Sequence, residues 1–558
     1  MTKRFWKWWQ ICGIVITTEV FIQNGALTLL RLINTWLLPQ AEVPFVSVNN
    51  VGRILTHHPW IFIAVVSELI VICVLSSVLF MTVMLAMEES NRGTLSWRHL
   101  IRRELKFIKK FKWWMMPLFL VEFVALAPLL SIAFRTPLLS NLRIPEVILD
   151  YGTRNGLLLV MTGLIYLICF ILTIHNGGTL TKAAITSDLH LIHEHQTALH
   201  FFRTLIITGI LSWLINGGLL LIQKISMNNH RVLSVVCLTL AQIAALFLCS
   251  WLLMRWGELN AGGQLTTSRP NRWWSGWSFI MLVLVVCETS LSSNSYFQSA
   301  RLTAPVTISH RGVANHNGVQ NSIAALKRTN KDYHPNYVEM DVHETKDHQF
   351  VVMHDENLQK LTTVNRRPNQ LTLDQLTHLT MHENGQTAKI ASLDNYLRVA
   401  NQLHQKLIIE LKTTPNDSPD VVAQFNRRYG QLIVQRHYLV HSLDYGLVSH
   451  LQRLNPRMKI LYLQAYNLTN PQPQIKGFNN EYSSLNERFI NAAHRQRKPV
   501  YAWTVNNPGA MNQLINQHVD GIVTDDVSTL QRTIRRTLGS QTDAERYWSY
   551  LNPIANLP

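Results

Sequence analysis

Four short motifs between residues 310 and 412 combine histidines, carboxylates and basic side chains that could act on a phosphate ester. In chain order, the motifs are His310-Arg311, Glu339-Met340-Asp341, His354-Asp355 and Glu410-Leu411-Lys412. Side chains two residues apart on a β-strand point to the same face. The two carboxylates of the second motif can therefore face one site, and so can the carboxylate and the amine of the fourth.

The residue types in these motifs indicate metal-assisted chemistry on a phosphate. Carboxylates without cysteine favour a hard cation, Mg²⁺ or Ca²⁺, and the expected ligands are Glu339, Asp341 and Glu410. Arg311 can bind a phosphate through two parallel hydrogen bonds, and Lys412 can act as a point charge. His310 and His354 suit proton transfer, one as base and one as acid, and the sequence leaves open which does which. The predicted reaction is cleavage of a phosphodiester.

Other histidines and acidic residues near the motifs are given no role in this prediction. We interpret His343 and Glu344, which follow the Glu-Met-Asp motif, as peripheral. The histidines elsewhere show no spacing typical of a metal site, among them His316, His334, His348 and His441. All six cysteines lie at or before Cys287, so the second part of the chain has neither a disulfide nor a cysteine-based metal site.

The elements that must position the motifs alternate between strand and helix after residue 305. Strands are expected at 306–312, 336–344, 350–355, 407–412, 437–442, 459–464, 499–505 and 520–525. Polar segments with helical periodicity lie between several of them, and this alternation predicts a parallel sheet. Eight strands in a segment of this length predict an α/β fold, a (β/α)8 TIM barrel over residues 301–540. Its active site would lie at the C-terminal ends of the strands, where the motifs fall. Residues 541–558 are expected to form a C-terminal tail.

The first 300 residues are expected to form an α-helical transmembrane domain. The chain of 558 residues is 47% apolar and only 15% charged, which excludes a disordered protein. A mean hydropathy of +0.06 indicates a mixture of membrane-spanning and other segments. A span needs about 20 mostly apolar residues, and about seven are predicted, at 11–33, 60–86, 114–134, 156–175, 204–223, 232–254 and 275–291. The net charge of +17 does not indicate a nucleic-acid partner, because no binding motif accompanies it.

The basic residues between the predicted spans set an orientation. One side carries 16 Lys and Arg, whereas the other carries 7. Because cytoplasmic loops are enriched in these residues, the N-terminus is predicted to be cytoplasmic. Seven spans then place the barrel outside the cytoplasm, and one span more or fewer would reverse this. The basic stretch 98–112 can be an amphipathic helix on anionic lipid or an ordinary cytoplasmic loop.

The motifs also carry a family resemblance. The segments ISHRGVANHNGVQNSIAAL and YVEMDVHETKDHQFVVMHDENL, with the later ELK, AWTVNNP and DGIVTDD, are similar to the glycerophosphodiester phosphodiesterase family. The first half resembles the membrane domain that is fused to such enzymes in Firmicutes. The resemblance implies a metal-dependent hydrolase that converts glycerophosphodiesters to glycerol 3-phosphate and an alcohol. It also implies the acid/base, metal and phosphate roles given to the motif residues above.

Two further residues enter through this resemblance. Trp503 is implied to line the glycerol side of the substrate pocket. Many family members carry Pro-Glu-Asn-Thr after the first strand, and that Glu binds the metal. This chain departs from the pattern with Val319-Gln320-Asn321-Ser322. Gln320 can offer a carbonyl oxygen to a metal, but no charge.

The sequence leaves alternative functions open. An outward-facing barrel would meet deacylated phospholipid headgroups or the polyglycerolphosphate of teichoic acids. Carboxylates are costly inside apolar spans, and three occur there, Glu19, Glu68 and Glu122. They favour the alternative of a transport or lipid-handling protein in which the barrel is an accessory or a sensor. The spans could also be only an anchor, and a phospholipase D-like enzyme acting on intact lipids would have a related fold.

Overall fold

The computed structural model describes the two halves of the chain to different extents. In the first half it describes residues 3–21, 27–37, 95–110, 195–226, 231–261 and 272–298, with short pieces at 25, 55–56, 58–64, 66–67, 71, 82–83, 85–86, 89–90, 121, 160–161 and 163–171. In the second half it describes residues 303–551 except 466–469 and 541.

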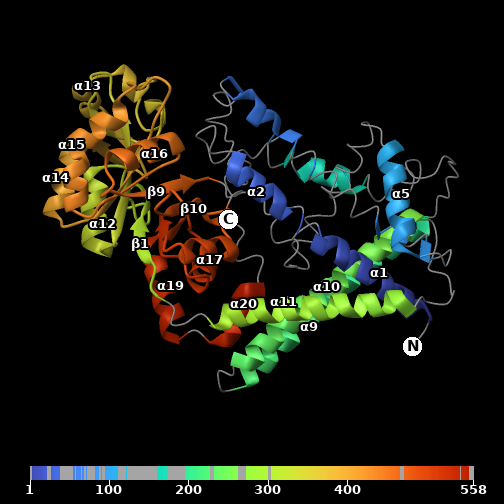
Figure 1. The fold of residues 1–558 in the computed structure, drawn as a ribbon. Coiled ribbons are helices and arrows are strands. Elements are labelled where there is room, and N and C mark those ends of the chain that lie inside the picture. Colours follow the sequence, from blue (N-terminus) through green and yellow to red (C-terminus); the bar gives the residue numbers. More distant parts are fainter. Residues whose placement is uncertain are drawn as a thin grey trace.

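Eight parallel strands form a closed barrel in the second half (Figure 1). They are β1 (Val306–Ser309), β2 (Tyr337–Glu344), β7 (Leu407–Leu411), β8 (Leu439–Ser442), β9 (Lys459–Gln464), β10 (Phe478–Glu481), β11 (Val500–Trp503) and β12 (Gly521–Thr524). Each strand pairs with the next in this order, and β1 pairs with both β12 and β2, which closes the ring. The predicted TIM barrel is therefore confirmed.

Helices cover the outside of the barrel and mostly alternate with its strands. They are α12 (Ile323–Tyr333), α14 (Leu393–Gln402), α15 (Val421–Gln435), α16 (Tyr445–Leu454), α17 (Glu487–Arg495), α18 (Pro508–Asn516) and α19 (Val527–Ser540). Several begin at a side-chain N-cap: the Ser322 side chain accepts the N–H of Ala325, and that of Asp444 accepts the N–H of Leu447. Their apolar faces pack on outward-facing strand residues such as Val338, and this layer is the main core.

The segment between β2 and β7 contains a small subdomain before its barrel helix α14. It comprises β3 (Phe350–Val352), the 3-10 turns η5 (Leu358–Lys360) and η6 (Pro368–Gln370), α13 (Leu373–Thr377), the hairpin of β4 (Thr380–Glu383) and β5 (Gln386–Lys389), and β6 (Ala391–Ser392). It has a core of its own, which includes Met353, Leu376 and Met381. The subdomain stands beside the C-terminal end of β2, next to the site.

Two strand predictions need correction. The run expected at 350–355 is β3, which pairs antiparallel with β2 and is not one of the eight barrel strands. The barrel strand that was missed is β10, whose sequence Phe-Asn-Asn-Glu lacks the apolar character of a buried strand. Its polar side chains are buried because they have partners: Asn480 Nδ2 donates to Gln464 Oε1 at 2.7 Å, and the Glu481 carboxylate accepts two backbone N–H groups of the 3-10 turn η7 (Tyr482–Ser484).

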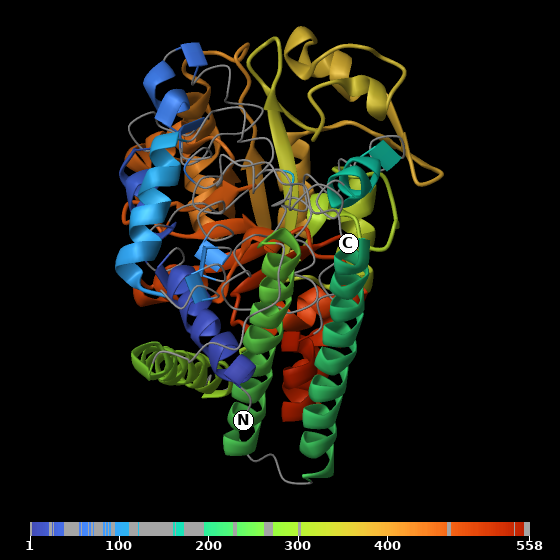
Figure 2. The ribbon, with the colours of Figure 1, turned by 90° about the vertical axis from the view of Figure 1, so that its right-hand side faces the viewer.

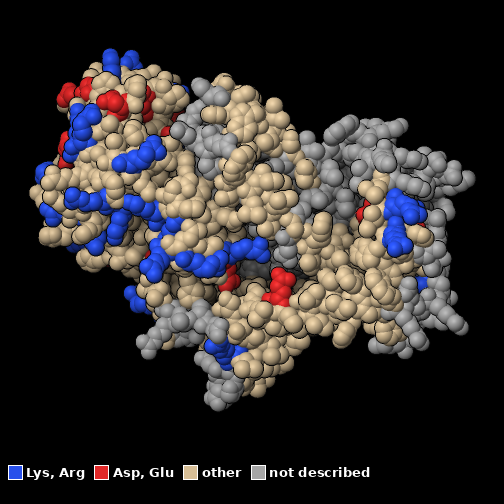
Figure 3. All heavy atoms as spheres, viewed as in Figure 1, with Lys and Arg blue, Asp and Glu red and all other residues tan. Residues whose placement is uncertain are grey.

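Three described helices of the first half are long and apolar enough to cross a membrane. The candidate spans are Arg203–Ile225 in α9 (His195–Ile225), Arg231–Arg255 in α10 (Arg231–Ala261) and Trp273–Phe297 in α11 (Arg272–Gln298). They coincide with the last three of the seven predicted spans. Figure 3 shows charged side chains over much of the barrel, whereas the described helices around α11 present a mainly uncharged surface.

The other four predicted spans are not confirmed. The first falls on two helices, α1 (Lys3–Val20) and α2 (Leu27–Leu37), and the other three lie largely outside the described residues. Glu68 and Glu122 also lie outside them, as does the side chain of Glu19, which sits on α1. The basic stretch expected at 98–112 is helical over α5 (Trp97–Lys110).

The expected C-terminal tail contains a helix, α20 (Asp543–Leu551), which packs on the membrane helices (Figure 2). Tyr547 is fully buried in a cluster with residues of α10 and α11, including Cys237 and Phe297. Arg546 donates to the carbonyl of Tyr296 at 2.5 Å, and the hydroxyl of Tyr296 donates to the carbonyl of Arg546 at 3.1 Å. This helix therefore joins the end of the barrel chain to the predicted spans.

Candidate active site

Alternation along the strands places polar residues directly above an apolar floor. Ile408 on β7 and Leu439 on β8 belong to a buried layer that crosses the barrel interior. Two residues further along the same strands, Glu410 and His441 point to the same side and are register partners. The polar layer thus lies at the C-terminal mouth of the barrel, which is the functional end of this fold.

Three buried side chains of this layer could hold a metal ion. Glu339, Glu410 and His441 offer ligand atoms that all lie within 4.8 Å of one another, and they form the one such group found among the described residues. Nε2 of His441 lies 3.7 Å from Oε1 of Glu339 and 3.8 Å from Oε2 of Glu410, and it has no hydrogen-bond partner. A buried, unpartnered nitrogen that faces two carboxylates fits a cation bound between them.

Asn479 of the unpredicted strand β10 supports the His441 ring. Its side-chain amide lies 3.2 Å from Nδ1 of His441, and its own Oδ1 is buried without a partner. Turning the amide would let Oδ1 accept the Nδ1–H, which would leave Nε2 with a free lone pair toward the carboxylates. Metal-binding histidines are commonly held through their second nitrogen in this way.

His310 follows β1 and is bonded to the last strand of the barrel. Its Nδ1 lies 2.8 Å from Oδ1 of Asp525, the residue directly after β12. Burial and the charge of Arg311 oppose protonation of His310, but the charge and hydrogen bond of Asp525, together with Glu339, outweigh them and raise its pKa. With Nδ1 occupied, Nε2 is the nitrogen left for proton transfer.

Arg311 is held in a backbone conformation that most residues avoid. Its φ of 52° lies in the left-handed region, its N–H donates to Oε2 of Glu339 at 2.8 Å, and its carbonyl accepts the N–H of Asn321 at 2.7 Å. Its Nη1 donates to Oε1 of Gln320 at 2.8 Å, and its Nε lies 3.8 Å from Oδ2 of Asp341. That Nε is buried without a hydrogen-bond partner. The guanidinium therefore retains donor capacity for an anion.

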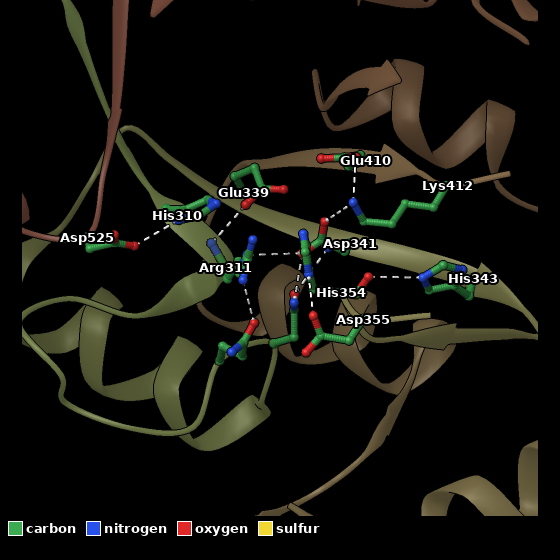
Figure 4. Close-up of polar contacts among 12 residues, drawn as sticks. His310, Arg311, Glu339, Asp341, His343, His354, Asp355, Glu410, Lys412 and Asp525 are labelled. Atoms are coloured by element: carbon green, nitrogen blue, oxygen red, sulfur yellow. Dashed lines mark hydrogen bonds and ion pairs between the residues drawn. The ribbon is translucent and has the colours of Figure 1, made fainter. Parts of the chain in front are cut away.

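Lys412 and Asp341 form an ion pair beside the metal-type group (Figure 4). Nζ of Lys412 lies 2.7 Å from Oε1 of Glu410 and 3.2 Å from Oδ1 of Asp341. Burial opposes the charge on Lys412, but the two carboxylates outweigh it and raise its pKa. The same cation, with His354 and Arg311, lowers the pKa of Asp341 against the effect of burial. Both groups are charged at neutral pH.

His354 reaches the site from the subdomain rather than from the end of a barrel strand. It follows β3, and its Nδ1 lies 3.0 Å from Oδ1 of Asp355. Its carbonyl lies 3.1 Å from Nε2 of His343, which is buried under the loop. His354 and His310 thus share one arrangement, with Nδ1 against a carboxylate and Nε2 left available. His343, interpreted from the sequence as peripheral, contacts the backbone of His354.

The two residues suggested by the resemblance lie at the rim of the site. Gln320 is buried between Arg311 and Glu383, and its side-chain oxygen accepts a hydrogen bond from Arg311. Trp503, on β11, is partly exposed, and its indole N–H donates to the carbonyl of Asn479 at 3.2 Å. Its ring therefore stands above the strand that supports His441.

Strand periodicity placed the seven motif residues at one end of the barrel, but four neighbours were missed: His441, Asn479, Asp525 and Glu383. His441 was set aside for lack of a spacing motif, although it lies at the end of a predicted strand beside Glu410. Asp525 is the last residue of the strand predicted at 520–525 and could have been found by the same argument. Glu383 lies on a hairpin that was not predicted, although its Asn384-Gly385 turn is a sequence signal for one, and only the fold reveals its contact with the site.

Family models match both halves of the chain. Residues 310–529 match the glycerophosphoryl diester phosphodiesterase family. Residues 2–259 match the membrane domain of glycerophosphoryl diester phosphodiesterase. The two matched segments correspond to the barrel and to the predicted transmembrane domain.

Curated relatives and solved structures cover about two fifths of the chain. The Bacillus subtilis protein YhdW is 28% identical over 232 residues, 39% of this chain and 93% of its own. A glycerophosphodiester phosphodiesterase of Caldanaerobacter subterraneus is 23% identical, over 41% of this chain and 98% of its own. A solved phosphodiesterase of Oleispira antarctica, in complex with sn-glycerol-3-phosphate, is 21% identical with a TM-score of 0.37, over 41% of this chain and 97% of its own. The chain belongs to the glycerophosphoryl diester phosphodiesterase family, in the form that carries the family's membrane domain, and is a hydrolase of glycerophosphodiesters.

Proposed function

We propose that the enzyme needs one divalent cation and releases glycerol 3-phosphate and an alcohol from its substrate. The observation that carries this proposal is the buried group of Glu339, Glu410 and His441 beside two basic side chains. Asp341, on the same face of β2 as Glu339, remains a predicted ligand, and Lys412 and Asn321 contact it here. An imidazole ligand also suits Zn²⁺ and other transition metals, so the donor set does not single out Mg²⁺ or Ca²⁺.

The side chains around this group have two further proposed roles, binding the phosphate and transferring protons. Arg311 and Lys412 neutralise the phosphate and orient it. One of His310 and His354 takes the proton from the attacking hydroxyl or water, and the other gives a proton to the leaving alkoxide as the P–O bond breaks. Asp525 and Asp355 hold the two rings and stabilise whichever is protonated. A bound cation would stabilise the charge that develops on the phosphate oxygens.

The proposed substrates are deacylated phospholipid headgroups or polyglycerolphosphate of teichoic acids. Both are glycerophosphodiesters, and Trp503 at the rim would contact the glycerol. We propose a multi-pass protein of the cell membrane with the barrel outside the cytoplasm. The distribution of basic residues in the first half supports this orientation.

The test is a product assay on the full-length protein purified in detergent. We expect glycerol 3-phosphate from glycerophosphocholine and from polyglycerolphosphate, with none from the His310→Ala variant. Release of choline with a cyclic or lipid-linked phosphate product from intact phospholipid would instead favour the phospholipase D-like alternative. Labelling of a cysteine introduced at an exposed barrel position, in intact cells, would test the orientation.

A further inference from the structure

Glu383, on the hairpin β4–β5, lies outside the ring of site residues but is bonded to it. Its carboxylate accepts the backbone N–H of Gln320 at 2.7 Å and the side-chain N–H of Gln320 at 2.6 Å. Oε1 of Gln320 in turn accepts Nη1 of Arg311 at 2.8 Å. We propose that Glu383 is a positioning residue that, through Gln320, orients the Arg311 guanidinium for the substrate phosphate; this inference rests on the proposed function.

The hairpin turn delivers Glu383 to this position. Asn384 and Gly385 form the two-residue loop, with φ of 53° and 69°, as the tight hairpin turns with positive φ at both central residues require. On β4, Met381 is fully buried in the subdomain core and Glu383 shares its face, whereas His382 points outward and is exposed. A register slip of one residue would turn Glu383 away from Gln320, so burial of Met381 fixes the contact.

Further contacts hold the hairpin against the loop that carries Gln320. Nδ2 of Asn384 donates to the carbonyl of Gly318 at 3.0 Å. Arg328 on α12 bonds both Gln386 at the start of β5 and the carbonyl of Asn317. The hairpin and the 317–320 loop are therefore joined at three points, and the Glu383 contact is the one that leads to the site.

The chemistry of the pair explains why a glutamine suits position 320. A carboxylate there would face Glu383 across 2.6 Å and repel it, whereas the amide donates to Glu383 and still accepts from Arg311. The neutral amide of Gln320 therefore restrains the guanidinium of Arg311 in place of a directly bound carboxylate. Hydrogen bonds with one charged partner are about twice as strong as neutral ones.

A charge swap tests this proposal with its own internal control. The variants are Glu383→Gln, Gln320→Glu and the double variant, all full-length, beside Asp374→Asn, whose exposed carboxylate lies elsewhere in the subdomain. We expect each single variant to lower kcat/KM about 10- to 100-fold and to weaken inhibition by inorganic phosphate. In the double variant, the amide introduced on the hairpin can accept the backbone N–H of position 320 and donate to the carboxylate introduced there, which still accepts from Arg311. We expect the double variant to recover most of the lost activity and phosphate affinity, and Asp374→Asn to match the wild type.

The outcomes separate this inference from the proposed function. If the wild type is active and His310→Ala is not, but Glu383→Gln equals the wild type, the positioning role is wrong while the proposed function stands. If kcat/KM and phosphate inhibition of the double variant are no better than those of the single variants, exchanging the hydrogen-bond donor and acceptor has no effect. The positioning role of Glu383 is then wrong as well. If the wild type releases no glycerol 3-phosphate, it is the proposed function that fails. Thermal unfolding of all variants shows whether a loss of activity reflects a loss of fold.

Discussion

His310 and Asp525 contact each other where the barrel closes, with Nδ1 of the histidine 2.8 Å from Oδ1 of the carboxylate. The two residues stand 215 positions apart in the chain, and the pairing of β1 with β12 brings them together. The contact fixes the ring of a proposed acid/base residue and raises its pKa.

Replacing Asp525 with Asn is expected to shift the pH dependence of the enzyme. Without the carboxylate, the pKa of His310 falls, so the limb of the kcat/KM profile that it governs moves to lower pH, by about one unit. If His310 is the base, the acid limb moves; if it is the acid, the alkaline limb moves. Asp526→Asn is the matched control, because the Asp526 carboxylate caps α19, where it accepts hydrogen bonds from the N–H of Thr529 and the hydroxyl of Ser528. Unmoved limbs in Asp525→Asn would contradict the assignment of His310.

Replacing His441 with Ala is expected to raise the cation concentration needed for half-maximal activity. The change removes the only nitrogen of the group formed with Glu339 and Glu410. The expected increase is about 10- to 100-fold, since even residues that only support metal ligands have effects of this size. Titration of activity with Mg²⁺, Ca²⁺, Mn²⁺ and Zn²⁺ measures it, with His450→Ala on α16 as the control. An unchanged titration curve would remove His441 from the proposed metal site.

Lys412→Met tests the charge balance of the site through stability. It leaves Glu410 and Asp341 buried without the amine that they share, and breaking a buried ion pair costs about 3–5 kcal/mol. We expect a lower Tm of the barrel and a larger rise of Tm on adding the divalent cation than in the wild type, because the cation then offsets the unpaired charge. An unchanged Tm in metal-free buffer would argue against a strong coupling of these groups.

The double variant Arg546→Ala and Tyr547→Ala tests the junction between α20 and the membrane helices. It removes the hydrogen bond from the Arg546 side chain to the carbonyl of Tyr296 and the contacts of Tyr547 in the cluster around Cys237, and losing a fully buried aromatic side chain costs about 3 kcal/mol or more. We expect faster amide hydrogen exchange over 233–242 in α10. Activity on a soluble diester should persist, because α20 follows the end of α19 that lies away from the catalytic mouth. Loss of that activity in a folded variant would show that the junction acts on the site.

The parts of the fold that follow from local pattern were predictable from sequence. Strands such as β2 and β7 are apolar on one face and carry the motif carboxylates at one end, which located both the barrel and its mouth. Strand β10 was missed because its burial depends on distant polar partners such as Gln464. The hairpin with Glu383 was missed although its Asn384-Gly385 turn is a sequence signal for a tight hairpin. Its docking on Gln320 is a tertiary contact that neither segment reveals by itself.

The site residues also differ in whether local pattern alone predicts them. Those in short motifs, such as Glu410 and Lys412, could be placed on one face by strand periodicity alone. His441 and Asn479 act through neighbouring strands, so their role depends on the register of β7, β8, β9 and β10. In the first half, hydropathy located α9, α10 and α11, whereas the packing of α20 on them involves residues of both halves and could not be read from either.

The proposed function requires one divalent cation bound by Glu339, Glu410 and His441 for diester hydrolysis. The most direct measurement counts the metal bound by the purified full-length protein after dialysis and follows glycerol 3-phosphate release in the same samples, for the wild type and Glu410→Gln. We predict about one bound cation per chain in the wild type, loss of activity on chelation, recovery on adding the metal back, and neither binding nor activity in the variant. Full activity of the metal-free wild type, or a metal content unchanged by Glu410→Gln, would contradict the claim.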